Sequence, residues 1–207
     1  MPKTEAEIKA VIFDIGNVLV HWDVRALYSQ LITDQDDLEY FLHEIITMEW
    51  HTEHDRGRPF SEGVKILSAQ YPEYAELIAA YDTRWNDTIG EAIGGTVDLL
   101  GQLKQAKTPV YGLTNFNQDK WAEFKDAYDF VGLLDGVVVS GEEQLVKPDP
   151  AIFDLTLSRF DLTPDRTLFI DDNYSNVRAA EKMGIKTHHF KGPEGLALDL
   201  KEYGLID

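Results

Sequence analysis

Carboxylates, a hydroxyl and a lysine recur along the chain, each at or soon after the end of a short apolar run. Three carboxylates that converge with one ammonium, a hydroxyl and loop amides can hold a hard divalent cation and an anionic group together. Such a set suits phosphoryl transfer to a carboxylate, which needs an in-line nucleophile and neutralised equatorial oxygens. The residues concerned are Asp14, Thr114 with Asn115, Lys147, and Asp171 with Asp172.

The runs that precede these residues are typical of buried parallel strands. Asp14 ends an apolar run that starts at Ala10, and we expect it at the carboxyl tip of the first strand. Because strands alternate with helices from Thr96 onward, the sequence predicts an α/β fold with a doubly wound parallel sheet. Ligands bind at the carboxyl edge of such a sheet. Further strands are predicted at 109–114, 136–140, 168–171 and 185–190, and helices at 97–107, 119–128, 150–160 and 175–183.

The segment from His21 to about Gly95 differs from both of its flanks. It is rich in aromatic and acidic residues, its apolar residues recur at helical spacing, and no strand is predicted in it. Its length of about 75 residues far exceeds an ordinary connection between two strands. We therefore expect a Rossmann-like core of residues 1–20 and 96–207 and a separate helical cap of residues 21–95.

The composition argues against several classes of protein. None of the 207 residues is cysteine, which rules out disulfides, thiolate nucleophiles and cysteine zinc sites. The formal charge of −18 argues against nucleic acid as a partner. No apolar run approaches a membrane span, residues 1–5 lack the apolar stretch of a signal peptide, and the expected setting is the cytoplasm. A small phosphorylated metabolite is compatible with the charge, since one lysine or a divalent cation can reverse the field locally.

Taken in order, four segments resemble the motifs of the haloacid dehalogenase (HAD) superfamily of hydrolases, in the branch with a helical cap inserted after the first motif. Each segment alone is a weak signal, and the four in order are specific. They are Val-Ile-Phe-Asp-Ile-Gly-Asn-Val-Leu at 11–19, Leu-Thr-Asn at 113–115, Val-Lys-Pro-Asp-Pro at 146–150, and Phe-Ile-Asp-Asp-Asn at 169–173 with Asn176.

The resemblance implies catalytic or binding roles for four residues of the first three motifs. Asp14 is expected to be the nucleophile and to form an aspartyl-phosphate. Thr114 and the amide of the neighbouring Asn115 are expected to hold the phosphoryl oxygens. Lys147 is expected to offset charge between the phosphate and Asp14.

A magnesium ion is also implied by the resemblance. Asp14, the Gly16 carbonyl and Asp172 are the expected ligands, and Asp171 is expected to support them through water or by contact with the ligands. Mg²⁺ prefers a few carboxylates together with waters and substrate oxygens, which agrees with this set. Asn176 stands one helical turn after Asp172 and can orient the acidic pair or Lys147.

One position departs from the common pattern of the HAD phosphatases. They carry a second aspartate two residues after the nucleophile, where it serves as acid for the leaving group and base for the attacking water, and this chain has Gly16 there. The resemblance narrows to the Asp-x-Gly-Asn variant, which includes sugar-phosphate phosphatases such as those acting on glucose 1-phosphate. His21 and Asp23 could supply the missing proton transfer, although two solvated loop residues are the favoured interpretation.

The predicted cap contains one segment that could contact a substrate. Residues 50–58 are polar and aromatic and end near a glycine, so they could reach over the crevice, with Arg56 as the favoured contact. The favoured alternative is a helix end with a solvated turn. The spacing of His51 and His54 is common on helix surfaces and does not favour a metal pair, and Trp85 is expected to pack.

The leading hypothesis is a magnesium-dependent phosphomonoesterase for a small metabolite, a sugar phosphate being one candidate. A 2-haloacid dehalogenase that uses Asp14 without metal is the first alternative. Without a cation, Asp171 and Asp172 beside Asp14 would repel one another and disfavour an anionic nucleophile, so the acidic pair favours the phosphatase. A non-catalytic binding module is the second alternative. The sequence indicates neither the substrate nor the oligomeric state.

Overall fold

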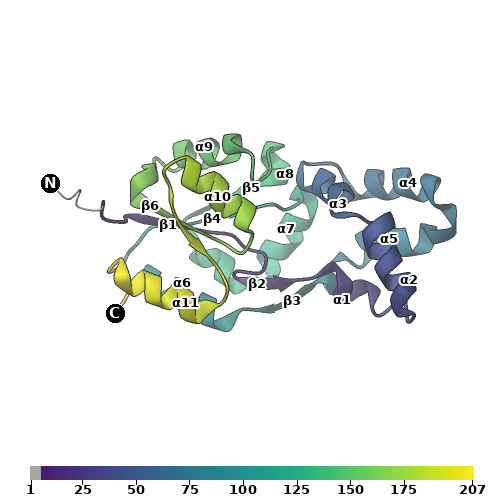
Figure 1. Ribbon diagram of the computed structural model, residues 1–207, viewed down its shortest axis with the longest axis horizontal. Helices are drawn as coiled ribbons and strands as arrows, with labels where there is room; N and C mark the ends of the chain where they lie inside the picture. The colour runs from purple at the N-terminus through teal and green to yellow at the C-terminus, as the bar shows by residue number, and fades with distance from the viewer. Residues whose placement is uncertain (1–5) are drawn as a thin grey trace.

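Strand β1 (Ala10–Phe13) lies at the centre of a five-stranded parallel sheet in the computed structural model of the chain, which describes residues 6–207 (Figure 1). Residues 1–5, part of the predicted core, lie outside the described residues. The strand order is β5-β4-β1-β6-β7, and all neighbouring strands are parallel. The predicted α/β fold is therefore confirmed. The other strands are β4 (Val110–Thr114), β5 (Gly136–Val139), β6 (Thr167–Asp171) and β7 (Lys186–His189).

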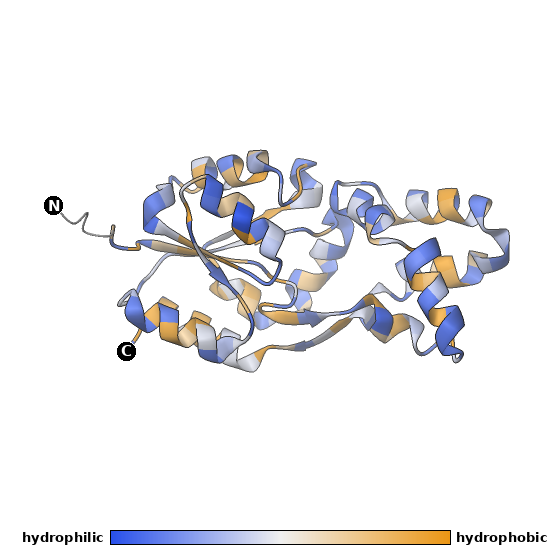
Figure 2. Cartoon of the chain, viewed as in Figure 1, coloured by the Kyte–Doolittle hydropathy of each residue, from blue (hydrophilic) through white to orange (hydrophobic). Residues whose placement is uncertain are grey.

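Helices cover both faces of the sheet, because successive side chains of each strand point to opposite sides. Val11 and Phe13 pack in one hydrophobic cluster and Ile12 in another. Figure 2 shows apolar strands between helices that carry both apolar and polar residues. The first cluster is covered by α6 (Gly94–Gln105), α7 (Gln118–Ala127) and α11 (Pro193–Glu202), the second by α9 (Pro150–Arg159) and α10 (Tyr174–Lys182). A short helix α8 (Ser140–Glu143) follows β5.

Residues 24–88, which we call the insertion, form a helical unit beside the sheet (Figure 1). Its apolar residues, among them Leu27, Phe41 and Ile78, make a hydrophobic cluster separate from those of the sheet. Its helices are α1 (Val24–Tyr28), α2 (Gln35–Tyr40), α3 (Met48–Asp55), α4 (Phe60–Gln70) and α5 (Ala75–Thr83), with a π-helical turn at Phe41–Ile45 and 3₁₀ turns at Pro72–Tyr74 and Trp85–Thr88. Among residues 6–207, no helix has the length and apolar character needed to cross a membrane.

Two strands lie where the sequence predicted none. Strands β2 (Val20–Trp22) and β3 (Ile89–Ala92) pair antiparallel and carry the chain from the sheet to the insertion and back. The prediction was wrong because these strands are only three and four residues long, and β3 contains glycine and glutamate, which strands disfavour. Pairing between residues so distant in sequence also leaves no local periodicity to detect.

The end of α3 is anchored to the sheet side of the molecule by hydrogen bonds. Asn117 Nδ2 donates to the carbonyl oxygens of His54 and Arg58, both at 3.0 Å. Ser140 Oγ donates to the carbonyl oxygen of Asp55 at 2.6 Å. These buried bonds hold one part of the insertion in a fixed position above the carboxyl edge of the sheet.

Candidate active site

The tips of the three central strands carry the polar groups that the sequence singled out. Asp14 follows β1 directly, Thr114 ends β4 and Asp171 ends β6. Because β1 lies between β4 and β6 and neighbouring strands are about 4.8 Å apart, the topology brings the three residues side by side. All three are buried.

Lys147 reaches this edge from the loop after α8. Its Nζ lies 2.8 Å from Asp14 Oδ1 and 2.7 Å from Asp171 Oδ2. Asn115 holds the Lys147 backbone at both polar atoms, donating to its oxygen at 3.0 Å and accepting from its nitrogen at 2.8 Å. Burial alone would lower the pKa of Lys147, but the carboxylates of Asp14 and Asp171 outweigh it and raise the pKa. Lys147 is therefore a fixed ammonium between two carboxylates.

Asp171 is bonded at both carboxylate oxygens by protein donors. Asn176 Nδ2 lies 3.0 Å from each oxygen, and the amide of Asn173 donates to Oδ1 at 2.8 Å. Together with Lys147 Nζ these donors saturate a completely buried side chain. Asp171 is thus suited to position Lys147.

Within residues 6–207, Asp14 keeps one carboxylate oxygen without a protein donor, and Asp172 lies close to it. Asp14 Oδ1 accepts from the amide of Ile15 at 2.7 Å, and no group of residues 6–207 bonds to Oδ2. Asp14, Asp171 and Asp172 each offer an oxygen within 4.8 Å of the others. Burial raises the pKa of Asp14 well above its usual range, despite the opposing effect of Lys147, and burial also raises the pKa of Asp172.

The charges of this cluster do not balance. With all three aspartates ionised, one ammonium leaves two negative charges uncompensated at the edge of the sheet. Every available ligand is a hard oxygen donor, which is the chemistry that Mg²⁺ requires. Gly16 lines the same cavity. The donor set therefore fits a divalent cation.

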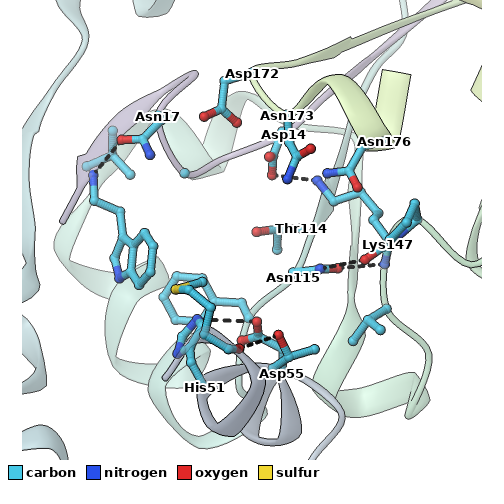
Figure 3. Close-up of a pocket in the computed structure, with 18 of the residues that line it drawn as sticks. Asp14, Asn17, His51, Asp55, Thr114, Asn115, Lys147, Asp172, Asn173 and Asn176 are labelled. Carbon is cyan, nitrogen blue, oxygen red and sulfur yellow. Dashed lines mark hydrogen bonds and ion pairs between the residues drawn. The ribbon is translucent and has the colours of Figure 1, made fainter. Parts of the chain in front are cut away.

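A cavity of about 460 Å³ separates the sheet edge from the insertion. In Figure 3, Asp14, Asp172 and Lys147 lie on one side of it and His51 and Asp55 on the other. No group of residues 6–207 bonds to the hydroxyl of Thr114, which faces this space. The remaining wall is mixed: its apolar part comprises Val20, Trp22, Met48, Trp85, Ile89, Phe116, Phe124, Val146 and Pro148, and its polar part comprises Asn17, Thr52, Arg56, Asn115, Asn173, Ser175 and Asn176.

Of the three residues that the sequence suggested for substrate contact or proton transfer, one borders the cavity and two do not. Arg56 borders the cavity, where its side chain is half-exposed and pairs with Glu53 at 3.0 Å. Asp23 caps α1 by accepting from an amide of that helix, and His21 is exposed on β2. Neither Asp23 nor His21 is among the described residues that line the cavity. The structure therefore gives them no place at the reacting centre.

The turn after α3 is at least partly exposed, as expected for a helix end with a solvated turn, but the last residues of the helix itself are buried. His51, His54 and Asp55 are all buried, and His51 Nε2 lies 3.3 Å from Asp55 Oδ2. The other ring nitrogen of His51 is hydrogen-bonded to the Tyr81 hydroxyl. The rings of Phe60 and Trp50 pack edge-on against the His54 ring. Neither ring nitrogen of His54 has a hydrogen-bond partner among residues 6–207.

Asp55 is the site residue that the sequence did not single out. Burial raises its pKa to about 8, against the opposing effects of Lys147 and Arg56, and burial lowers the pKa of His51 to about 4. The available signal was the spacing of His51 and Asp55, which places both on one face of a helix. Trp85 packs in the insertion as expected, and it also lines the cavity.

The doubly wound sheet, with a charged site at its carboxyl edge and a helical insertion above that site, places the chain among α/β proteins that bind ligands at the tips of their strands. Residues 8–184 match the family of haloacid dehalogenase-like hydrolases, and the chain belongs to this family. The resemblance inferred from the four motifs is confirmed.

Relatives over nearly the whole length carry the names of phosphatases. The chain is 27% identical to a sesquiterpene phosphatase of Aspergillus oryzae, over 94% of this chain and 95% of the relative. It is 30% identical to a glyceraldehyde 3-phosphate phosphatase of Pyrococcus furiosus, over 95% of this chain and 87% of the relative. A HAD-family enzyme of Bacteroides thetaiotaomicron, solved in complex with magnesium and inorganic phosphate, has the same fold, with a TM-score of 0.69 and 25% identity. The match covers 89% of this chain and 95% of the Bacteroides chain.

Proposed function

We propose that the protein is a magnesium-dependent phosphomonoesterase that acts on a small phosphorylated metabolite through an aspartyl-phosphate. The observation that carries this proposal is the contact between Asp14 and Lys147 beside two further aspartates at the wall of a ligand-sized cavity. The phosphatase names of the relatives support the same activity. In this proposal residues 1–20 and 96–207 form the catalytic core and residues 21–95 the cap.

Asp14 is the nucleophile in the proposed mechanism. Its carboxylate attacks phosphorus while Oδ1 stays bonded to the Ile15 amide and to Lys147, which keeps the side chain aimed into the cavity. The Thr114 hydroxyl and the Asn115 amide bind phosphoryl oxygens. Lys147 neutralises charge between the phosphoryl group and the nucleophile, where fixed charges act most strongly because water is excluded.

The proposed magnesium ligands are Asp14, the Gly16 carbonyl and Asp172. Asp171 stays outside this set and, with Asn176, holds Lys147 in place. When bound, the ion neutralises the excess negative charge of the carboxylates and of the phosphoryl oxygens. The magnesium in the related Bacteroides structure supports this choice of metal.

The apolar part of the cavity wall suits a substrate with an apolar portion. Trp22, Trp85 and Phe116 present aromatic surface that such a portion would cover, although polar lining residues such as Asn17 and Ser175 also offer hydrogen-bond partners. Arg56 at the rim is the proposed contact for a polar or anionic end of the substrate. The sesquiterpene phosphatase among the relatives agrees with an apolar substrate, and the sugar phosphate stays a prediction to be compared with it.

A haloacid dehalogenase would use the same nucleophile without metal. The acidic cluster disfavours it, since a carbon centre with a halide leaving group gives Asp171 and Asp172 no cation to offset their charge. A non-catalytic module would have no need for the ammonium that Asp171, Asn115 and Asn176 fix in place.

One set of assays separates the three functions. Phosphate release is measured from phosphosugars, an isoprenyl phosphate and an aryl phosphate, each with Mg²⁺ and with a chelator, beside halide release from 2-chloropropionate. We expect phosphate release that needs Mg²⁺ and falls on the order of 10⁶-fold in Asp14→Asn protein. The matched control is Asp154→Asn, which removes an exposed carboxylate on α9.

Three outcomes would contradict the proposal. Phosphate release that persists in chelator or in Asp14→Asn protein would exclude the proposed metal or nucleophile. Halide release without phosphate release would favour the dehalogenase. Release of neither product would favour the binding module.

A further inference from the structure

The proposed phosphatase lacks a proton donor on the sheet side of the cavity. A poor leaving group, such as the alkoxide of a primary alcohol, needs a proton as its bond to phosphorus breaks. Lys147 is engaged by two carboxylates, and the position two residues after Asp14 is Gly16, which has no side chain. His21 and Asp23 do not line the cavity. This inference rests on the proposed function and concerns the source of that proton.

We propose that Asp55, which the insertion presents to the cavity opposite Asp14, is the general acid and general base of the reaction. Figure 3 places its carboxyl group across the open space from Asp14 and Asp172, with Thr114 between them. A phosphoryl group bound at the sheet edge would therefore have its leaving oxygen on the side of Asp55.

The backbone of Asp55 is held on this side with little freedom. Ser140 Oγ donates to its carbonyl oxygen, and Asn117 bonds the carbonyl oxygens of His54 and Arg58 on either side of it. Both Asn117 and Ser140 are buried residues of the sheet side. Asp55 thus belongs to the insertion in sequence but has a position fixed by the part of the chain that carries the nucleophile, which proton transfer requires.

The side chain of Asp55 is oriented by a buried pair. The Tyr81 hydroxyl bonds His51 Nδ1, and His51 Nε2 lies 3.3 Å from Asp55 Oδ2. When Tyr81 donates to Nδ1, the neutral imidazole carries its proton on Nε2 and can donate to Oδ2. Among residues 6–207 nothing bonds to the other oxygen, Oδ1, which is left to carry the exchangeable proton toward the substrate. His51 and Tyr81 are positioning residues in this arrangement.

The surroundings of Asp55 favour its neutral form near neutral pH. The ionisable groups that face it are His51 on its own helix, Tyr81 on α5, Arg56 next to it and Lys147 on the sheet side. Burial outweighs the two cations and raises the pKa of Asp55 to about 8, so the acid is protonated when substrate binds.

The two half-reactions balance with Asp55 as the only proton carrier. In the first, Asp14 attacks phosphorus, the bond from phosphorus to the leaving oxygen breaks, and the Asp55 proton moves to that oxygen. The products are the free alcohol, aspartyl-phosphate and the Asp55 carboxylate. In the second, water attacks phosphorus, its proton moves to Asp55, and the bond to Asp14 breaks to release inorganic phosphate.

Asp55→Asn is the direct test, because the amide keeps the shape and cannot donate an acid proton. We expect kcat/KM for a primary alkyl phosphate to fall about 10²- to 10⁴-fold. The rate of the initial nitrophenol burst from an aryl phosphate should stay within about threefold, because that leaving group needs no proton. Steady turnover of the aryl ester should nevertheless slow, since hydrolysis of the aspartyl-phosphate has lost its base.

Two further measurements separate this role from a structural one. The control Glu49→Gln removes an exposed carboxylate from the same helix and should leave both esters unaffected. In the unmodified protein, kcat/KM for the alkyl ester should fall above about pH 8 because Asp55 loses its proton. The rate of the aryl burst should show no such fall. The pH profile needs no variant and so does not depend on how Asp55→Asn folds.

A second-site variant tests the role by rescue. A Cβ at Gly16 would meet only Trp22 Cβ, at 3.9 Å, which is ordinary contact, so the backbone there accepts a side chain, and the residue lines the cavity. Adding Gly16→Asp to Asp55→Asn protein should raise kcat/KM for the alkyl phosphate at least about tenfold above that of Asp55→Asn alone.

The outcomes distinguish this inference from the proposed function. Equal losses for alkyl and aryl esters, or no loss for either, in an active enzyme would overturn the role of Asp55 and leave the phosphatase standing. An unmodified protein that releases phosphate from no ester would overturn both.

Discussion

Two aspartates face the same cavity from opposite sides, and their surroundings differ in one decisive respect. Asp14, at the tip of β1, has an ammonium at 2.8 Å and a backbone amide on the same oxygen. Asp55, at the end of α3, has no cation within ion-pair distance among the described residues and only the imidazole of His51 beside it. Both are buried, so the difference lies in the charges around them.

This difference assigns the two carboxyl groups different chemistry. Burial raises the pKa of both groups, but Lys147 opposes this rise at Asp14, and a bound divalent cation would add to that effect and favour the anionic form that a nucleophile needs. A buried carboxyl without such a cation stays neutral and can donate a proton. The sheet edge therefore supplies fixed charge, and the insertion supplies the carboxyl group of Asp55 and part of the apolar wall. The proposed reaction needs both at one cavity.

The largest expected effect comes from removing the cation of the sheet side. Lys147→Met leaves Asp14 and Asp171 buried without their partner, so we expect a loss of about 3–5 kcal/mol in the free energy of unfolding. Phosphate release should fall about 10²- to 10³-fold. Urea unfolding and steady-state kinetics check both. Lys104→Met, which breaks a surface pair with Asp135, should cost at most about 1 kcal/mol, and an equal cost for both would remove the contrast between buried and exposed pairs.

An effect of opposite sign on stability, which grows with pH, is expected for the acid of the insertion. In the unfolded chain Asp55 ionises near its ordinary pKa of 3.8, and in the folded protein near 8. Between these values the folded state binds the extra proton, so this group's contribution to stability is present at low pH and is lost as pH rises toward 8. Asp55→Asn removes the penalty and should stabilise the protein increasingly with pH, by at most about 1.4 kcal/mol per pH unit.

Unfolding of both proteins in chelator at several pH values between about pH 5 and 8 checks this slope. The comparison isolates Asp55, because His51, His54 and every other group titrate in both proteins. A stability difference that stays constant over this range would mean that Asp55 is already ionised in the folded state.

The smallest effect is expected in the apolar wall. Trp85→Phe keeps an aromatic ring in the cluster of the insertion but enlarges the cavity, and we expect a cost of about 1–2 kcal/mol in unfolding free energy. KM for an aryl or isoprenyl phosphate should rise several-fold, with little change in kcat. Phe153→Leu, in a cluster away from the cavity, should cost similar stability and leave KM unchanged. A kcat loss in Trp85→Phe with KM intact would place the wall in the chemical step.

Much of the sheet side could be predicted from the sequence because its signals are local. Strands β1, β4, β5 and β6 are mostly apolar runs, Asp14, Thr114 and Asp171 stand at the ends of three of them, and the parallel order of the strands brings these residues together. The insertion was predicted as helical, but β2 and β3 were missed, since their pairing joins residues about 70 positions apart and both strands are very short.

Asp55 shows most clearly what the sequence left open. In the sequence it is one of 37 acidic residues, in a segment whose polar composition suggested a solvated turn. Its burial comes from Ser140 and Asn117, which lie far along the chain and hold the end of α3 by its carbonyl groups. No periodicity or motif encodes such contacts.

The sequence by itself therefore determined the family, the parallel sheet and the residues at its carboxyl edge, because strand periodicity and motif order are properties of the chain. The tertiary structure decided which carboxyl groups are paired and which are not, and that Asp55 rather than His21 or Asp23 faces Asp14 across the cavity. The physical reason is that burial and the distance between charges set the ionisation of a carboxyl group, and both arise only when distant segments pack together.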